Sequence, residues 1–193
     1  MSPRGVATPD AREQLFQAAE RVLARDGLEG LTSRAITGEA GVAKGLLFNH
    51  FSDLDQFLAE LVLDRARATG PLAGELASRA GTRTVQENLV DAAASILRSH
   101  AFAVAGIIHA RPTLMSRLHQ ISSGRPYAVL DDVEQRFASY LEAEKALGRL
   151  PADTDAATVG FILVGVVHHI FMTDMANSPT LRRRLQRIVS SLI

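Results

Sequence analysis

The chain has 193 residues, of which 21 are basic and 21 acidic, so its formal net charge at neutral pH is zero. Hydrophobic residues make up 47% and charged residues 22%, a composition that is typical of a globular protein and that excludes intrinsic disorder. Because the overall charge gives no support to nucleic-acid binding, such binding requires a local site. The sequence has no cysteine, which excludes disulfides, thiol catalysis and cysteine-ligated metals.

No targeting or membrane segment is predicted. The N-terminus, MSPRGVATPDAREQ, lacks the apolar stretch of a secretory signal. The longest apolar run, residues 156–167, ends at His168 and is shorter than the roughly 20 residues that span a bilayer. We therefore expect a soluble, cytoplasmic protein in which this run forms a buried or interface helix.

Two helices can be delimited from their capping residues in the first 60 positions. Thr8 and Pro9 form a start signal for a helix that ends at Gly27, a residue suited to a left-handed backbone. Ser52 and Asp55 have the spacing of a capping box, which predicts the start of another helix.

A helix-turn-helix is predicted between these two helices, over about residues 33–51. Thr32 caps one short helix, Gly41 breaks it after Ala40, and a second short helix follows over about residues 44–50. The spacing turns one apolar set inward: Ile36, Ala40, Val42, Leu47 and Phe51. It leaves a polar set outside: Arg34, Lys44, Asn49 and His50. Such a unit can place its second helix in the major groove of DNA.

The rest of the chain is also predicted to be helical, with a boundary at the glycine-rich residues 68–83. The predicted later helices cover about residues 84–98, 101–110, 113–121, 127–147, 154–176 and 178 onwards. The first of them starts with a Thr84–Glu87 capping box. The expected fold is all-α with nine or ten helices: a helix-turn-helix domain (1–52), a connecting helix and linker (53–83), and a ligand-binding and dimerisation domain (84–193).

At these positions the chain resembles the TetR family of transcriptional regulators. The matching residues are Thr32, Ile36, Ala40, Gly41, Val42, Lys44, Gly45, Leu47, His50, Phe51, Asp55 and Leu58, with the connector G-R-L-P-x-D-x-D-A at residues 148–156. The match at the helix-turn-helix covers about a quarter of the chain, and the remainder matches in architecture. The resemblance implies a homodimeric regulator that binds operator DNA and a small molecule.

The chain departs from the family pattern at four positions. Ala43 replaces the usual serine cap of the recognition helix, and Leu46, Phe48 and Leu54 replace residues that donate to phosphate. Fewer phosphate contacts imply weaker and less salt-sensitive binding. The expected DNA-binding residues are Thr32, Ser33, Arg34, Lys44, Gly45, Leu46, Phe48, Asn49 and His50, with Leu46 and Phe48 either packing or contacting thymine methyls.

The C-terminal domain contains scattered aromatic and polar side chains that could line a mainly apolar effector pocket. Its candidate lining residues are Phe102, His109, Met115, His119, Tyr127, Phe137, Tyr140, Phe161 and His168. Each of them could equally belong to the core or the surface. His168 and His169 point about 100° apart on a helix and no acidic residue completes a ligand set, so we expect neither metal nor cofactor.

The last two predicted helices have the pattern of a dimer interface. The segment 155–172 is apolar around most of its circumference, and Gly160 and Gly165 permit close approach. With the amphipathic last helix it could form half of a four-helix bundle between two copies, as the resemblance implies. The expected interface residues are Phe161, Val164, Gly165, His168, Leu181, Leu185 and Ile188. The arginines at 182, 183, 184 and 187 are expected to be solvated.

The favoured function is therefore a DNA-binding regulator, expected to be a repressor that a small effector releases from its operator. The alternative, motivated by the lost phosphate donors, is a small-molecule-binding or protein-interaction module with weakened DNA affinity. We expect no enzyme, because no nucleophile, base or phosphate-loop spacing is present.

Overall fold

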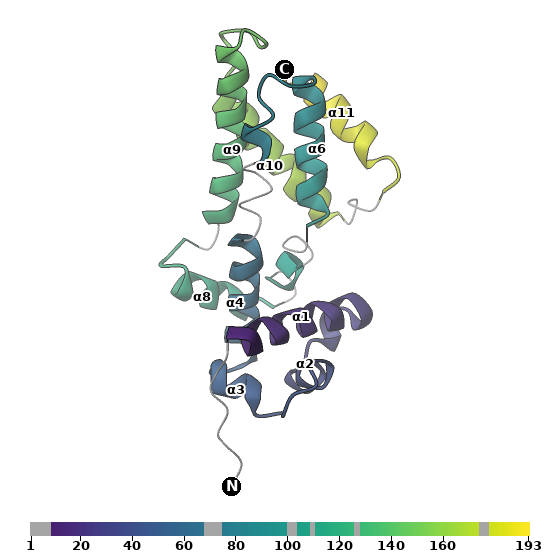
Figure 1. Ribbon diagram of the computed structural model, residues 1–193, viewed down its shortest axis with the longest axis vertical. Helices are drawn as coiled ribbons and strands as arrows, with labels where there is room; N and C mark the ends of the chain where they lie inside the picture. Colours follow the sequence, from purple (N-terminus) through teal and green to yellow (C-terminus); the bar gives the residue numbers. More distant parts are fainter. Residues whose placement is uncertain (1–8, 68–74, 100–103, 109–110, 126–127, 174–177) are drawn as a thin grey trace. The chain divides into compact units, whose positions relative to one another are not determined.

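The computed structural model describes residues 9–67, 75–99, 104–108, 111–125, 128–173 and 178–193. Within these ranges all regular secondary structure is helical, which confirms the predicted all-α fold (Figure 1). The chain divides into two compact units. The first contains residues up to Asp64 and from Val104 to Gly124, and the second contains Arg65–Ala103 and Arg125–Ile193.

The helices of the first unit include the predicted helix-turn-helix. Its elements are α1 (Pro9–Asp26), the 3-10 turn η1 (Leu28–Gly30), α2 (Ser33–Glu39), α3 (Leu46–His50), α4 (Leu54–Arg67) and α8 (Thr113–Ile121). The start of α1 at Pro9 and the left-handed Gly27 after it, with φ of 69°, agree with the expected helix signals.

The core of the first unit is built on a cluster of three phenylalanines. The Phe16 ring centroid lies 6.0 Å from that of Phe51 and 5.4 Å from that of Phe57, and Phe51 meets Phe57 edge-on at 4.9 Å. All three side chains are buried. Truncating one such ring to alanine typically costs about 3–5 kcal/mol. The cluster joins α1, the end of α3 and α4, and so fixes the helix that follows the turn.

Residues 104–124 belong to this first unit, whereas the division made from the sequence had placed them in the C-terminal domain. Their apolar side chains explain the difference, because Val104, Ile107, Leu114 and Leu118 are buried in the core of the first unit. A segment that follows the helix-turn-helix by more than 50 residues in the chain is thus part of the same packed body.

The start of α4 corrects one prediction. The expected box of Ser52 and Asp55 does not form; Asp53 caps the helix, because its Oδ1 accepts from the Gln56 amide at 2.7 Å. Gln56 reaches back, and its Oε1 accepts from the Ser52 amide at 2.9 Å. The hydrogen bond from Gln56 lowers the pKa of Asp53. Asp55 is left to contact other elements.

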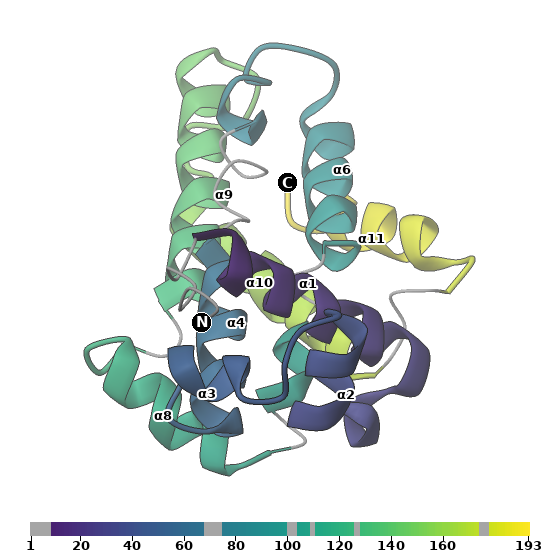
Figure 2. The same ribbon diagram turned by 60° about the horizontal axis from the view of Figure 1, so that its bottom comes forward.

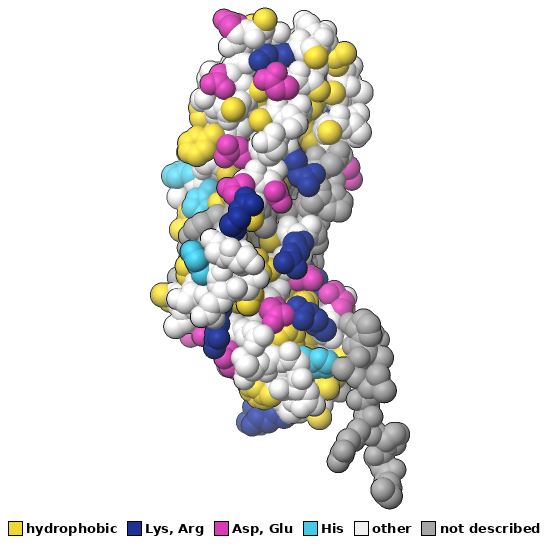
Figure 3. Space-filling view, turned by 90° about the vertical axis from the view of Figure 1, so that its left-hand side faces the viewer, with side chains coloured by type: hydrophobic (Ala, Val, Ile, Leu, Met, Phe, Trp, Pro, Cys, Tyr) yellow, Lys and Arg dark blue, Asp and Glu magenta, His cyan; other side chains and the backbone are white. Residues whose placement is uncertain are grey.

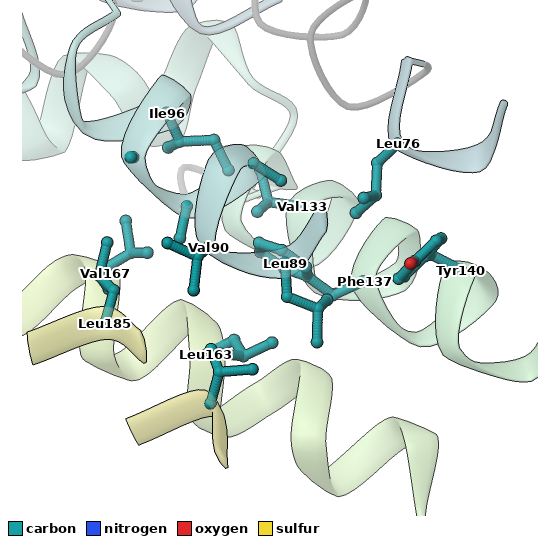
Figure 4. Close-up of a cluster of buried hydrophobic side chains, with 14 of the residues drawn as sticks. Leu76, Leu89, Val90, Ile96, Val133, Phe137, Tyr140, Leu163, Val167 and Leu185 are labelled. Atoms are coloured by element: carbon teal, nitrogen blue, oxygen red, sulfur yellow. The ribbon is translucent and has the colours of Figure 1, made fainter. Parts of the chain in front are cut away.

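The second unit packs four long helices around a single apolar core. They are α6 (Val85–Leu97), α9 (Ala128–Ala146), α10 (Ala156–Met172) and α11 (Leu181–Ser190). Figure 4 shows side chains from α6, α9, α10 and α11 converging, among them Leu89, Phe137, Leu163 and Leu185. The helices α9 and α10 lie against each other, as do α6 and α11 (Figure 1).

Two predicted features of this unit are confirmed. Thr84 and Glu87 form the capping box at the start of α6, each accepting a backbone N–H of the other. Gly160 allows the close approach of α10 to α9, because a Cβ there would lie 3.0 Å from the Glu134 carbonyl oxygen. α10 begins at Ala156, close to the predicted start at about 154, and Asp155 is its N-cap.

Candidate nucleic-acid interface

The turn between α2 and α3 has the geometry of a helix-turn-helix (Figure 2). The Thr32 hydroxyl caps α2 by accepting from the Ala35 amide at 3.1 Å. Gly41 has a left-handed backbone, with φ of 67°, and the Val42 amide donates to the Thr37 carbonyl at 3.0 Å. These bonds end α2 and reverse the chain, so the turn places α3 across the end of α2.

The predicted inward and outward faces of the helix-turn-helix are confirmed. Four of the five inward residues are buried, namely Ile36, Ala40, Leu47 and Phe51. The fifth, Val42, is half-buried. Outside lie Arg34, Lys44, Gly45, Phe48 and Asn49, all exposed, with Ser33, Leu46 and His50 half-buried and Thr32 exposed at its capping position. The structure therefore brings the nine expected DNA-binding residues into one local unit.

The cations of this unit fall into two groups. Arg21 and Arg25 both pair with Glu39 of α2, at 2.7 Å each. The hydrogen bonds from Arg25 and Arg21 lower the pKa of Glu39, which therefore stays ionised. These arginines fasten α1 to α2. They are not the cations that the exposed face offers to a ligand.

A third arginine of α1 is also engaged inside the unit. The Arg12 guanidinium pairs with Glu60 at 2.5 Å and lies over the rings of Phe16 and Phe51, at 5.1 and 5.2 Å from their centroids. Arg34 and Lys44, by contrast, are exposed and form no ion pair with any residue in the described part of the chain. They lie on either side of the turn, where they are free to contact the phosphates of a DNA backbone.

The helix α3 also shows the consequence of its departures from the family pattern. It has five residues, its N-cap is Gly45, and no side chain caps it. This agrees with the loss of a capping serine at Ala43, and the regular helix starts at Leu46 instead of Lys44. Phe48 is 49% exposed, an unusual position for a phenyl ring unless another surface covers it.

The described surface does not carry one large basic patch on the face shown in Figure 3. In the coloured part of the face shown in Figure 3, basic, acidic and hydrophobic side chains are interspersed. This distribution agrees with the zero net charge. Any attraction of a nucleic acid must therefore come from a few side chains at close range.

The six candidate pocket residues that the structure describes are divided between the two units. Phe102, His109 and Tyr127 lie outside the described residues. Met115, half-buried, and His119, exposed, are on α8 of the first unit. The other four belong to the second unit. Phe137 and Tyr140 are buried in its core, Phe161 is exposed and His168 is half-buried.

Tyr140 takes part in a buried polar network of the second unit. Asn88 donates to the Tyr140 hydroxyl at 3.0 Å and to the Thr82 carbonyl at 2.9 Å. Burial and the hydrogen bond with Glu144 raise the pKa of Tyr140. Glu144 is itself buried and pairs with Arg149 at 3.3 Å. Both of these partners of the Tyr140 hydroxyl, Asn88 and Glu144, are buried side chains of the second unit.

The expected interface residues separate into buried and exposed ones. Leu181 and Leu185 of α11 pack into the core of their own unit against α6, so another copy cannot reach Leu185, which has no exposed surface. Ile188 is half-buried. On α10, Phe161 is 65% exposed. The space beside Gly165 is open, because a Cβ at this position would meet no atom within 4 Å. Val164 and His168 are half-buried on the same helix.

Two kinds of site are absent from the described residues. No group of three or more histidine and acidic residues there could hold a metal ion. Likewise, no helix in those ranges is long and apolar enough to cross a membrane.

Sequence reasoning missed a set of polar side chains, at the start of α8 and just before it, that contact the residues flanking the helix-turn-helix. Arg111, Thr113 and Arg117 contact residues 31, 53 and 55. No local pattern identifies them, since their partners are 56 to 80 residues away in the chain.

Comparison with known proteins agrees with this geometry. Residues 15–61 match the family model described as bacterial regulatory proteins, tetR family. An uncharacterized HTH-type transcriptional regulator of Haemophilus influenzae is 37% identical over 54 residues, which are 28% of this chain and 29% of that protein. The sequence similarity to this relative is thus confined to less than a third of its length.

Solved structures resemble the chain over nearly its whole length. A putative TetR-family transcriptional regulator from Mesorhizobium loti is 17% identical, with a TM-score of 0.69 over 97% of each chain. SmeT, the repressor of the Stenotrophomonas maltophilia multidrug efflux pump SmeDEF, is 19% identical, with a TM-score of 0.61 over 93% of this chain and 88% of SmeT. At these identities the likeness concerns the fold. The helix-turn-helix region of this chain therefore matches the tetR family model in sequence, and the whole chain resembles solved TetR-family regulators in fold.

Proposed function

We propose that this protein binds a pseudo-palindromic operator in double-stranded DNA as a homodimer, and that it represses transcription in the cytoplasm until a small, mainly apolar effector releases it. The observation that carries the proposal is the pair of exposed cations, Arg34 and Lys44, that flank the turn of a TetR-type helix-turn-helix. Every other described basic residue before position 50 is held by a carboxylate of the protein.

The chemistry of each exposed side chain indicates which part of the DNA it would contact. Lys44 and Arg34 would contact phosphates on either side of the major groove, helped by Thr32, Ser33, His50 and the backbone near Gly45. Asn49 is exposed on α3 and its amide can pair with an adenine edge. Leu46 and Phe48 have no hydrogen-bonding group, so they would contact thymine methyls. A dimer would place two such helices about one helical turn apart.

The dimer would use the exposed side of α10, where Phe161, Val164, Gly165 and His168 lie along one helix. Gly165 would permit close approach of a second copy, as Gly160 does for α9 within the chain. The buried Leu181 and Leu185 would support this surface from inside by holding α11 on α6. Ile188 would lie at its edge.

The repressor role and the effector rest on the family resemblance, supported by SmeT, whose name states that it represses a multidrug efflux pump. An effector would favour a conformation in which the separation of the two recognition helices does not fit the operator. The affinity of the protein for DNA would then fall by a factor that is limited by how much more tightly the effector binds this conformation than the DNA-binding one. The pocket would draw on the second unit, with Phe161 and His168 on α10 as the accessible candidates.

A second candidate is a small-molecule-binding or protein-interaction module with weakened DNA affinity. The uncapped five-residue α3 and the apolar Leu46 and Phe48 on it favour this alternative. It predicts dimerisation and ligand binding without a specific DNA complex.

Selection of bound fragments from genomic DNA by the purified protein separates the two. At about 150 mM salt, recovery of a shared inverted repeat supports a specific regulator, because non-specific binding is weak at that ionic strength. Recovery of unrelated sequences would refute it and would favour the alternative.

A further inference from the structure

We infer that Arg111 is a positioning residue for the helix-turn-helix, because one guanidinium joins the residue that precedes α2 to the first turn of α4. Its Nη2 donates to the Leu31 carbonyl at 3.0 Å, and its Nη1 lies 3.5 Å from Asp55 Oδ1. The effect on DNA recognition rests on the proposed function; the effect on the helix-turn-helix itself does not.

The two partners of Arg111 lie at opposite ends of the motif in the sequence. Leu31 immediately precedes Thr32, the N-cap of α2. Asp55 lies in the first turn of α4, just after α3 ends at His50. Everything that would touch DNA therefore lies between two points held by the same side chain. A planar guanidinium with several fixed N–H groups can hold two acceptors at once, which a lysine cannot do with the same geometry.

The two partners of Arg111 differ in how far they depend on it. Leu31 has no exposed surface, so its carbonyl oxygen cannot turn to water and requires a donor inside the protein. Asp55 is only 31% exposed and also accepts from the Thr113 hydroxyl at 2.8 Å. Thr113 and Arg111 are neighbours across Pro112, the N-cap of α8. The start of α8 therefore carries a two-residue clamp that faces the helix-turn-helix, and α8 lies beside the start of α4 in both ribbon views (Figures 1 and 2).

Arg117, which lies on α8 six residues after Arg111, supplies a matched comparison. Its Nη2 donates to Asp53 Oδ2 at 2.6 Å, so it also pairs with the start of α4. Among the described residues, no hydrogen bond or ion pair joins Arg117 to the segment before α2. If bridging both ends is what matters, loss of Arg111 and loss of Arg117 must have different consequences although both break an arginine–aspartate pair.

The first test needs no DNA. Amide hydrogen exchange is measured on the wild type, Arg111→Gln and Arg117→Gln. Arg111→Gln is expected to speed exchange in the first turns of both α2 and α4, where the Ile36 amide bonds to the Thr32 carbonyl and the Phe57 amide to the Asp53 carbonyl. Arg117→Gln is expected to speed exchange at α4 alone. Equal patterns in the two variants would overturn the inference.

The second test uses a DNA site selected by the wild type, well below the melting temperature of each variant. Arg111→Gln is expected to weaken specific binding about tenfold or more, the scale set by loss of one partly buried charged hydrogen bond. Arg117→Gln should stay within about threefold of the wild type. The slope of affinity against salt should not change in Arg111→Gln, because Arg111 does not contact phosphate. An unchanged affinity, or a reduced salt slope, would contradict a positioning role.

Arg111→Lys keeps the charge and serves if the glutamine variant does not fold. It is expected to recover less than half of the lost binding free energy, since one ammonium cannot hold both acceptors in the guanidinium's geometry. Full recovery would overturn the bridging explanation. If the wild type selects no DNA site, the proposed function fails, and the exchange patterns still decide whether Arg111 holds both ends of the motif.

Discussion

Asn88 of α6 donates a hydrogen bond to the Tyr140 hydroxyl of α9 across 3.0 Å, and neither side chain has exposed surface. The contact joins two helices whose residues are 52 positions apart in the chain. Glu144 extends it to the loop before α6, since its carboxylate accepts from the Gly81 amide at 3.3 Å. The network specifies how α6 packs on α9, because a shifted helix would leave these groups buried without partners.

Tyr140→Phe tests this network. The change keeps the ring but removes the acceptor for Asn88 and the donor to Glu144, so it should lower the free energy of unfolding by about 1–3 kcal/mol. Urea denaturation at a fixed protein concentration measures it. Gln135→Ala, on the exposed side of the same helix, is the control and should change stability by less than about 0.5 kcal/mol. A phenylalanine variant as stable as the wild type would show that the hydroxyl contributes nothing.

The dependence of the free energy of unfolding on pH at acidic pH should involve Asp91. Its carboxylate pairs with Arg83 at 2.6 Å and with Arg182 of α11 at 2.7 Å. Burial acts to raise the pKa of Asp91, but the hydrogen bonds from these arginines outweigh it and hold that pKa below its ordinary value. A lowered folded-state pKa means that the contribution is complete above about pH 4, the unfolded value, and is lost as the pH falls through the folded value.

Asp91→Asn should therefore lower the free energy of unfolding by about 1 kcal/mol at pH 7. As the pH falls through the lowered folded-state pKa of Asp91, the variant and the wild type should converge. Thermal or urea unfolding across this pH range measures the difference. Asp131→Asn breaks an exposed pair with Arg125 and should have a smaller effect at pH 7. A difference that is independent of pH would contradict the assignment to the Asp91 charge.

The proposed dimer surface can be tested with two exposed apolar residues of the second unit. Phe161 on α10 is 65% exposed and Leu147 after α9 is 56% exposed. Phe161→Glu should shift the protein from dimer to monomer in sedimentation velocity, because an unpaired charge in an apolar interface is costly. Leu147→Glu, with the same change of charge, should leave the assembly state unchanged. Dissociation by both variants, or by neither, would place the contact elsewhere.

Phe48 should make the selected operator sensitive to single methyl groups. Replacing thymine by deoxyuridine removes only the C5 methyl, and at a contacted position it should weaken binding about three- to tenfold if the phenyl ring covers that methyl. Titration by fluorescence anisotropy measures the change. In Phe48→Ala the same DNA replacement should have little effect. An equal loss in wild type and variant would mean that another residue reads the methyl.

The sequence was informative where local chemistry decides the structure. Gly41 as a turn glycine, the inward Ile36 and Leu47, and the Thr84 capping box all depend on neighbours within a few residues, and all were predicted correctly. Arg111 could not have been identified, because its partner Leu31 lies 80 residues away and is chosen by tertiary packing.

Two further residues show where patterns are ambiguous. Asp55 has the right spacing for a capping box, but Asp53, two residues earlier, caps the helix, and Asp55 accepts a hydrogen bond from Thr113 of α8 instead. Leu185 belongs to a clean amphipathic stripe, which can pack within the chain or across a dimer with the same periodicity. In the structure it packs within the chain, on α6.

The most direct test of the account compares wild type and Lys44→Ala on a selected inverted repeat and on a scrambled duplex, at several salt concentrations. The account predicts that the wild type prefers the inverted repeat by about a thousandfold or more. It also predicts that Lys44→Ala weakens binding and reduces the log–log salt slope by about 2, since each protomer of the dimer loses one phosphate contact. Equal affinity of the wild type for the two duplexes would contradict specific recognition by this helix-turn-helix.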